Sequence, residues 1–185
     1  MAELIERKIF MASNTPDGFV GYFDQIVDNY RLNKLYILKG GSGVGKSTFI
    51  QKFARALIAH YKGRRRLTVD YLMCSADPKS YDGAIIHELG IGIIDGTFPH
   101  ITDPKYPGLV DEIIDLAQFI DSGKIKMTQA ELYEMKKQRK DCFRRAYAEL
   151  YRARELHEQV EAVYGGAVDF GKVDKVFSEI IKTHI

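Results

Sequence analysis

One short segment has the residue types and the spacing of a phosphate-binding loop. The pattern G-x-x-x-x-G-K-[ST] is matched by Gly40, Gly45, Lys46 and Ser47. In such a loop the glycines allow backbone N–H groups to surround a polyphosphate, and the lysine neutralises the β- and γ-phosphate oxygens. The hydroxyl after the lysine coordinates Mg²⁺. The segment therefore predicts a site for the phosphates of a nucleotide.

The residues expected to bind the nucleotide are the whole loop and the start of the helix after it. They are Gly40, Gly41, Ser42, Gly43, Val44, Gly45, Lys46, Ser47 and Thr48. Lys46 is expected to contact the β- and γ-phosphates, and Thr48 is suited to an α-phosphate oxygen. The expected cofactors are ATP and Mg²⁺, with Ser47 as one ligand of the ion.

An aspartate at the end of a neighbouring buried strand commonly completes such a magnesium site. Asp95 in IGIIDGT (91–97) follows an apolar run and is the clean candidate, whereas Asp70 lies inside another run and is weaker. Asp-Gly is also common turn chemistry, so a turn role for Asp95 stays open. We expect Asp95 to be a metal ligand and, with Lys46, a catalytic residue.

Two sequence patterns are absent, and their absence indicates which nucleotide is bound and how fast it is hydrolysed. No Asn-Lys-x-Asp guanine signature follows a later strand, and this favours ATP over GTP. No glutamate follows Asp95, so the usual water-activating carboxylate is missing from that position. Rapid intrinsic hydrolysis is therefore not expected.

Further polar candidates follow the apolar run at 67–74, where α/β sheets place their ligands. They are Ser75, Asp77 and Asp82. Asp77 is the third expected catalytic residue, a carboxylate that orients a nucleophile, although ADPKSYDG is equally good turn chemistry. His100 could sense the γ-phosphate and Glu88 is a comparable candidate, but a loop histidine is more often incidental.

The segments around these residues predict alternating strands and helices. KLYILK (34–39) is typical of a strand covered on both faces, and KSTFIQKFARALIAHYKG (46–63) predicts a helix ending near Gly63. LTVDYLMC (67–74) and two runs within 84–97 predict further strands, with a short helix at 82–89 as an alternative. Thr15 can cap a helix that extends to Tyr30. The pattern favours an α/β fold, a P-loop NTPase-like, mostly parallel sheet flanked by helices.

The second half of the chain predicts helices only. TFPHITDPKYPG (97–108) excludes regular structure, and LVDEIIDLAQFI (109–120) predicts a helix. The run 127–164 predicts one helix of about 55 Å at 1.5 Å per residue. We expect a nucleotide-binding core (1–126), a long helical arm (127–168) and a return helix (169–185) that packs on the core or the arm.

Composition and charge restrict the partners. The 185 residues carry a formal net charge of +2, with 45% hydrophobic and 28% charged residues, as in an ordinary globular protein. Such a balance does not favour nucleic acid as a partner. No apolar run approaches the roughly 20 residues of a membrane helix, and the N-terminus lacks the apolar core of a signal peptide. We expect a cytoplasmic protein without membrane association.

Four blocks, in order, resemble an uncharacterised family of bacterial P-loop ATPase-like proteins. They are ILKGGSGVGKST, CSADPKSYDG, ELGIGIIDGTFPH and DPKYPGLVDEIIDL. The similarity extends over nearly the whole chain. Members of that family carry two P-loop modules in tandem, and this sequence resembles the first. The resemblance implies nucleotide binding and a second module as a candidate partner, and it implies no particular reaction or substrate.

Three functional hypotheses follow. The leading one is a Mg-ATP-binding domain that acts as a slow ATPase or nucleotide-dependent switch, in which the arm reports the state of the loop. The second is a small-molecule or nucleotide kinase, with the arm and the 97–108 loop closing over an acceptor and Asp77 as base. The third is a non-enzymatic interaction module, in which the arm forms a homodimer or docks a partner and the nucleotide is structural.

Overall fold

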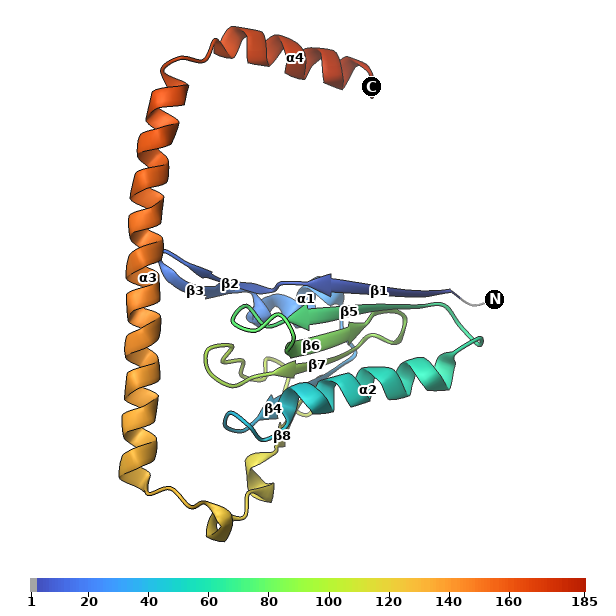
Figure 1. Cartoon of the computed structure of the whole chain (residues 1–185). Helices are drawn as coiled ribbons and strands as arrows, with labels where there is room; N and C mark the ends of the chain where they lie inside the picture. The colour runs from blue at the N-terminus through green and yellow to red at the C-terminus, as the bar shows by residue number, and fades with distance from the viewer. Residues whose placement is uncertain (1–2) are drawn as a thin grey trace.

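The computed structural model describes residues 3–185, which form an α/β core and two C-terminal helices (Figure 1). The main sheet has six strands in the order β1-β5-β6-β7-β4-β8. In that order they span Leu4–Ile9, Leu67–Met73, Tyr81–Ile86, Ile91–Asp95, Lys34–Lys39 and Asp111–Asp115. Only β6 runs against the others, because β1 is parallel to β5 and β4 is parallel to both β7 and β8. The expected α/β class with a mostly parallel sheet is confirmed.

The remaining elements are a small hairpin, four α-helices and short 3₁₀ turns. The hairpin strands are β2 (Ala12–Thr15) and β3 (Gly18–Gly21). The α-helices are α1 (Ile26–Tyr30), α2 (Lys46–Tyr61), α3 (Gln129–Gly165) and α4 (Phe170–Lys182). The 3₁₀ turns are Phe23–Gln25, His87–Leu89, Ala117–Phe119 and Ser122–Lys124.

Both faces of the central strand β4 are covered, as its unbroken apolar run indicates. Leu35 and Ile37 are at most 1% exposed on the face covered by α1 and the hairpin, and Leu38 is 0% exposed on the face covered by α2. A strand with both faces covered needs apolar residues at successive positions. The prediction of a buried strand at 34–39 is confirmed.

Helix α2 lies against the sheet and begins directly after the glycine loop. Ile50 and Ala54 are fully buried, and Phe53 and Leu57 pack around them in the same cluster. This spacing of three and four places one apolar stripe on the sheet. Gly63 has a φ of +74°, which suits the left-handed end of a helix and confirms the expected end point.

The pair β6–β7 is an antiparallel hairpin within this sheet. Only His87–Leu89 and Gly90 connect the two strands, with Gly90 at a φ of +62°. Such a short connection cannot carry the crossover that a parallel pair needs. The predicted strand AIIHEL (84–89) is therefore confirmed for AII, which belongs to β6, while HEL forms a 3₁₀ turn.

The helix expected from Thr15 to Tyr30 is wrong, because residues 12–21 form the β2–β3 hairpin. Thr15 pairs with Gly18 across a two-residue turn of Pro16 and Asp17. Gly18 has a φ of +102°, and Pro-Asp-Gly is a strong turn signal. The turn chemistry overrides the helical spacing, and only Ile26–Tyr30 is α-helical.

The helix expected at 109–120 is also wrong. Its first half is β8, which pairs in parallel with the edge of β4 from Leu35 to Lys39. The strand begins at Asp111, which is 4% exposed and whose Oδ2 accepts hydrogen bonds from the N–H groups of Lys105 and Tyr106. An open strand edge offers unpaired backbone groups, and these favour a strand over the helical alternative.

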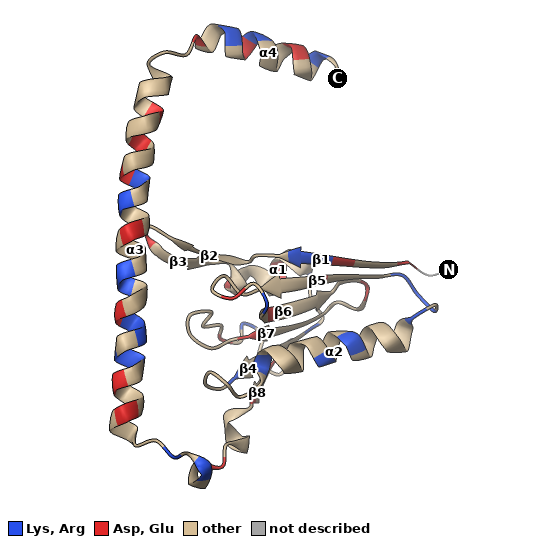
Figure 2. Ribbon diagram, viewed as in Figure 1, with Lys and Arg blue, Asp and Glu red and all other residues tan. Residues whose placement is uncertain are grey.

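Helix α3 is the single long helix that the sequence predicts. Thr128 and Glu131 form a reciprocal capping box at its start. It contacts the core at the hairpin, where the hydroxyl of Tyr147 donates to Asn14 Oδ1 over 2.8 Å and Arg154 lies 2.9 Å from Asp17. Figure 1 shows α3 beside the tip of β2 and β3. Figure 2 shows acidic and basic residues interspersed along it. No helix within residues 3–185 is long and apolar enough to cross a membrane.

Helix α4 turns away from α3 and does not pack as expected (Figure 1). Every residue from 166 to 185 is exposed, including the five apolar side chains on one side of the helix. These are Val173, Val176, Phe177, Ile180 and Ile181. The expected return helix exists, but its apolar face covers neither the core nor the arm.

Candidate functional site

The glycine loop connects β4 to α2 and has a backbone that only glycine adopts readily. Gly40, Gly43 and Gly45 have φ values of +139°, +89° and +89°. In this left-handed region a Cβ atom collides with the backbone of its own residue. At Gly40 a Cβ would also lie 2.9 Å from Val44 Cγ2. The pattern found in the sequence is thus needed for the shape of the loop.

Lys46 lies under the loop and is 9% exposed. Its Nζ donates to the backbone oxygens of Gly40 and Gly41, over 2.6 and 2.9 Å, and lies 3.5 Å from Asp95 Oδ2. A buried ammonium needs such partners to offset the loss of water. These contacts hold the cation at the loop, where the first turn of α2 adds its positive end.

Ser47 joins the start of α2 to the start of β6. Its Oγ accepts the N–H of Tyr81 over 2.9 Å. A hydroxyl has two lone pairs and one hydrogen, so Ser47 keeps one acceptor position and one donor for another group. Thr48 is exposed beside it. Loop, lysine and helix N-terminus together form an arrangement that can bind an anion such as a phosphate.

Asp95 ends β7 next to the strand that leads into the loop. It lies opposite Leu38 in the β4–β7 register, and its side chain is 15% exposed. Oδ1 accepts the N–H of Thr97 over 2.8 Å, while Oδ2 faces Lys46. The Thr97 hydroxyl in turn donates to Gly40 O over 3.1 Å. The structure therefore brings Lys46, Ser47 and Asp95 to one edge of the sheet.

Two weaker candidates from the sequence join Asp95 in one cluster. Asp82 belongs to β6 rather than to a loop, and its Oδ2 lies 3.0 Å from His100 Nε2. One ligand atom from each of Asp82, Asp95 and His100 lies within 4.8 Å of the other two. The sequence contains both residues as separate candidates, but only the folded structure shows that they meet.

Lys39 is a positioning residue that the sequence does not reveal. Its Nζ donates to the backbone oxygens of Gly96 and Thr102, over 2.8 and 2.9 Å. These two bonds hold both ends of the loop that carries His100 against the end of β4. A lysine at the end of an apolar run is a common strand end, so its position alone carries no signal.

Asp77 lies in the β5–β6 loop at the same edge of the sheet and is exposed. Its Oδ1 accepts the N–H of Lys79 over 3.0 Å, which is the local turn contact that its sequence context also suggested. Within the described residues it makes no ion pair with Lys46 and is not part of the Asp82, Asp95 and His100 cluster. A catalytic role for Asp77 stays a prediction.

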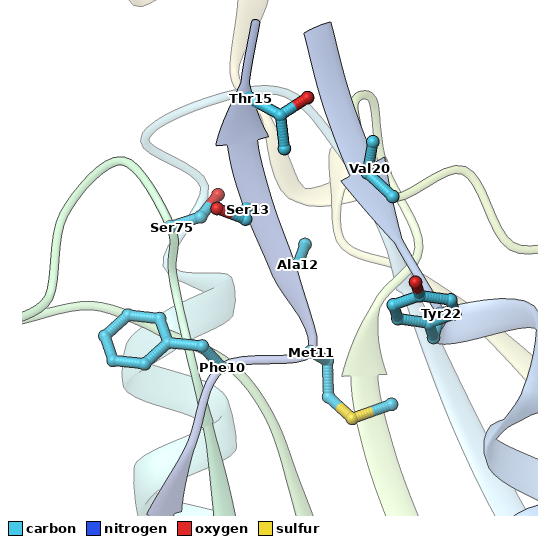
Figure 3. Close-up of a pocket in the computed structure, with 8 residues that line it drawn as sticks. All are labelled: Phe10, Met11, Ala12, Ser13, Thr15, Val20, Tyr22 and Ser75. Atoms are coloured by element: carbon cyan, nitrogen blue, oxygen red, sulfur yellow. The ribbon is translucent and has the colours of Figure 1, made fainter. Parts of the chain in front are cut away.

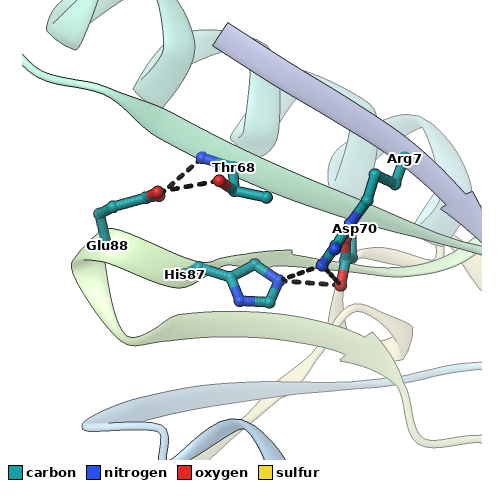
Figure 4. Close-up of polar contacts among 5 residues, drawn as sticks. All are labelled: Arg7, Thr68, Asp70, His87 and Glu88. Atoms are coloured by element: carbon teal, nitrogen blue, oxygen red, sulfur yellow. Dashed lines mark hydrogen bonds and ion pairs between the residues drawn. The ribbon is translucent and has the colours of Figure 1, made fainter. Parts of the chain in front are cut away.

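Asp70 and Glu88 take part in structural contacts away from the glycine loop (Figure 4). Asp70 is fully buried and accepts from Arg7 over 2.6 and 2.9 Å, and it lies 2.8 Å from His87 Nε2. Burial alone would raise the pKa of Asp70, but the hydrogen bonds from Arg7 and His87 outweigh it and lower that pKa. Glu88 accepts from the N–H and hydroxyl of Thr68.

A separate pocket of about 440 Å³ lies between the hairpin and the β5–β6 loop (Figure 3). Its lining combines apolar side chains with hydroxyl groups and comprises Phe10, Met11, Ala12, Ser13, Thr15, Val20, Tyr22 and Ser75. Of these described residues none is charged, so the pocket offers no cation to a phosphate. It is a less suitable phosphate site than the glycine loop.

No family model, curated protein or solved structure matches this chain. The resemblance to tandem P-loop ATPase-like proteins therefore stays a prediction from the sequence. Any function has to be argued from the geometry of the glycine loop and its neighbours.

Proposed function

We propose that this chain has a P-loop NTPase-like fold, binds Mg-ATP at residues 40–48, and acts as a slow ATPase or nucleotide-dependent switch. One observation carries the proposal. The cation of Lys46 is held under a loop of left-handed glycines, 3.5 Å from Asp95, at the N-terminus of a 16-residue helix. This combination of backbone N–H groups, a fixed cation and a helix dipole suits a polyphosphate.

Lys46 would exchange its contacts with Gly40 and Gly41 for the β- and γ-phosphate oxygens. Ser47 and Asp95 fit a magnesium ion, because the hydroxyl keeps a free lone pair and the carboxylate faces the loop. When bound, magnesium neutralises charge on the phosphate oxygens. The N–H group of Thr97 donates to the Asp95 carboxylate and fixes its position. The carboxylate therefore does not have to be ordered when the metal ion binds.

The surroundings of Lys46 support slow rather than fast hydrolysis. A fast ATPase needs a carboxylate free to orient the attacking water. Asp95 is held by Lys46 and Thr97, and Asp82 lies beside His100. Asp95 is thus engaged by other groups, and Asp82 lies against the imidazole of His100 without a hydrogen bond to it.

A chain of contacts supports a switch in which α3 responds to the nucleotide. His100 lies beside Asp82 and packs on two phenylalanines. Its ring centroid is 5.3 Å from that of Phe19 and 4.9 Å from that of Phe23. Phe19 belongs to β3, and the β2–β3 hairpin contacts α3 through Asn14 and Asp17. The measurement that tests such coupling is a change in α3 when nucleotide binds at the glycine loop.

Phosphorus NMR of Mg-ATP with the purified chain tests the proposal and separates it from a kinase. Slow release of inorganic phosphate that stops in Lys46→Ala, but continues in Lys52→Ala on the exposed side of α2, supports an ATPase. If a new phosphoester forms when a metabolite extract is added, and if its formation depends on Lys46, the chain is a kinase rather than an ATPase. Equal phosphate release by wild type and Lys46→Ala would contradict a role of this loop in hydrolysis.

The exposed face of α4 favours a second candidate function, self-association through this return helix. Val173, Phe177 and Ile180 are 51%, 63% and 54% exposed on one side of the helix. An amphipathic helix gains stability by burying such a face. A second copy of the chain offers an identical face, and closed pairing of identical faces is the commonest form of assembly.

A further inference from the structure

Three side chains beside the glycine loop form a cluster that phosphate binding does not explain. Asp82 comes from β6, Asp95 from the end of β7, and His100 from the loop after β7. One ligand atom from each lies within 4.8 Å of the other two. Carboxylate oxygens and imidazole nitrogens are typical ligands of divalent transition metals.

The register of β6 and β7 places the two carboxylates together. Gly83–Ile94 is the last pair of this antiparallel hairpin, and Asp82 and Asp95 are the residues that adjoin this pair at the same end of the sheet. Asp82 lies at a β-bulge, between the β5–β6 pairs Leu72–Gly83 and Met73–Tyr81. One carboxylate oxygen of each residue lies within 4.8 Å of the other, so two negative charges here repel each other. Asp82 is 4% exposed, so water screens this repulsion poorly. A cation between the two carboxylates would remove it.

Lys46 offsets only part of this negative charge. Its Nζ lies 3.5 Å from Asp95 Oδ2 and forms its short contacts with the carbonyl groups of Gly40 and Gly41. An imidazole that binds a metal is neutral, so two carboxylates and one ammonium leave a net negative charge at the cluster. A divalent cation reverses that sign and would favour an anionic phosphate next to it.

His100 supplies a nitrogen ligand aimed at the carboxylates. The residue is 7% exposed, and neither ring nitrogen has a hydrogen-bond partner within residues 3–185. Asp82 Oδ2 is likewise without one, since it lies 3.0 Å from Nε2 without the alignment that a hydrogen bond requires. Buried polar atoms left unsatisfied are costly and rare. A shared metal ion would satisfy the nitrogen and the oxygen together.

The ring of His100 is also held in place. Phe19 and Phe23 pack on it from the hairpin and the following 3₁₀ turn, and Lys39 anchors Gly96 and Thr102 on either side of it in the chain. A ligand whose orientation is fixed by its neighbours binds metal with less loss of conformational freedom.

We propose that Asp82, Asp95 and His100 bind a divalent transition-metal ion, such as Mn²⁺ or Co²⁺, at the edge of the glycine loop. Bonds of about 2.0–2.2 Å to nitrogen and oxygen put ligand atoms roughly 3–4 Å apart, so small side-chain rotations suffice. The imidazole favours these ions over Mg²⁺ and Ca²⁺, which prefer oxygen ligands alone. The proposal rests on the proposed function only for the place of the site beside the phosphates. The ion binds without nucleotide and is distinct from the Mg²⁺ of Mg-ATP, with which it shares Asp95 as a ligand.

The test is titration of the metal-free full chain with Mn²⁺ alone, followed by electron paramagnetic resonance, and with Co²⁺ followed by its visible absorption. Wild type binds one Mn²⁺ per chain. His100→Phe keeps an aromatic ring against Phe19 and Phe23 but removes the nitrogen ligand, and it weakens binding by about tenfold or more, because even outer partners of a metal site contribute 10–100-fold. The matched control His60→Phe, at an exposed position of α2, leaves binding unchanged.

A second variant, Asp82→Asn, weakens Mn²⁺ binding in the same way, and a circular dichroism melt checks that each variant is folded. Equal Mn²⁺ affinity in wild type, His100→Phe and Asp82→Asn would overturn the metal site, as would no saturable binding by wild type at millimolar Mn²⁺. Lys46→Ala separates the two proposals. It removes the competing cation, so it keeps or strengthens Mn²⁺ binding while losing ATP binding.

Discussion

The ammonium of Lys46 lies 3.5 Å from the carboxylate of Asp95, and this pair joins the glycine loop to the end of the neighbouring strand β7. Both groups are mostly buried, with 9% and 15% of their side chains exposed. Each is also held by backbone groups, Lys46 by two carbonyls and Asp95 by the N–H of Thr97. The charges that would meet a nucleotide are therefore already positioned in the fold.

The left-handed glycines of the loop predict a position-dependent effect of alanine. Gly45→Ala forces a Cβ into a φ of +89° and should lower the free energy of unfolding by roughly 1–2 kcal/mol. It should also weaken ATP binding, because the loop backbone shifts. Urea unfolding and ATP titration measure the two effects.

Gly41→Ala is the matched control for this loop. Gly41 is not among the described residues with positive φ, and a Cβ there meets no atom within 4 Å. Its unfolding free energy should stay within about 0.5 kcal/mol of wild type. Equal loss of stability in Gly45→Ala and Gly41→Ala would contradict the view that the positive φ of Gly45 causes the effect.

The buried carboxylate of Asp70 predicts a loss of stability in acid. Its pKa is lowered in the fold from an ordinary value of 3.8, so it contributes stability above that pH. The contribution is lost as the pH falls through the lowered pKa of the folded state. Asp70→Asn should reduce stability near pH 7 and flatten this acid dependence, as measured by urea unfolding between about pH 6 and pH 2.

Asp103→Asn controls for the general effect of removing a carboxylate, because its side chain is 86% exposed. This variant should keep the acid dependence of wild type. If Asp70→Asn also keeps the full dependence, the contacts with Arg7 and His87 are not its source.

The hairpin contacts predict that α3 responds to nucleotide through Tyr147. Tyr147→Phe removes the 2.8 Å hydrogen bond to Asn14 and should leave ATP affinity unchanged. Hydrogen exchange of α3 should change on adding Mg-ATP to wild type, and this change should be smaller in Tyr147→Phe. Tyr164→Phe, at a side chain 70% exposed, should behave as wild type. No ATP-dependent exchange in α3 of wild type would exclude the arm as a reporter.

The apolar face of α4 predicts concentration-dependent self-association. Phe177→Asp places a charge on that face and should shift the chain toward monomer in sedimentation velocity experiments. Lys175→Asp introduces the same side chain on the polar side of the helix and should leave the assembly intact. A wild-type chain that stays monomeric at high concentration would rule out self-association through this face.

The sequence predicts the part of the site that lies within one continuous strand-loop-helix unit, because that part depends on local patterns. KLYILK, the glycine pattern and the stripe on α2 fix the loop and Lys46, and the apolar run before Asp95 marks the end of β7. Asp82 and His100 are different, because their proximity depends on the β6–β7 register and on Lys39 holding a loop. Contacts of that kind join separate segments and leave no local periodicity.

The two wrong helices have separate physical causes. At 12–21 the Pro-Asp-Gly turn at Pro16–Gly18 outweighs apolar residues at helical spacing. At 111–115 pairing with the open edge of β4 outweighs the helical pattern and produces a strand. The first error hides the hairpin that packs on His100, so a misassigned element also conceals part of the site.

Calorimetric titration of Mg-ATP into the purified full chain tests the proposed function most directly, with Lys46→Ala compared with Lys52→Ala. Wild type and Lys52→Ala should bind one nucleotide with equal affinity. Lys46→Ala should bind at least about 100-fold more weakly, a loss of roughly 2.7 kcal/mol for a charge-assisted phosphate contact. Circular dichroism confirms that both variants are folded. Unchanged affinity in a folded Lys46→Ala variant would contradict nucleotide binding by the glycine loop.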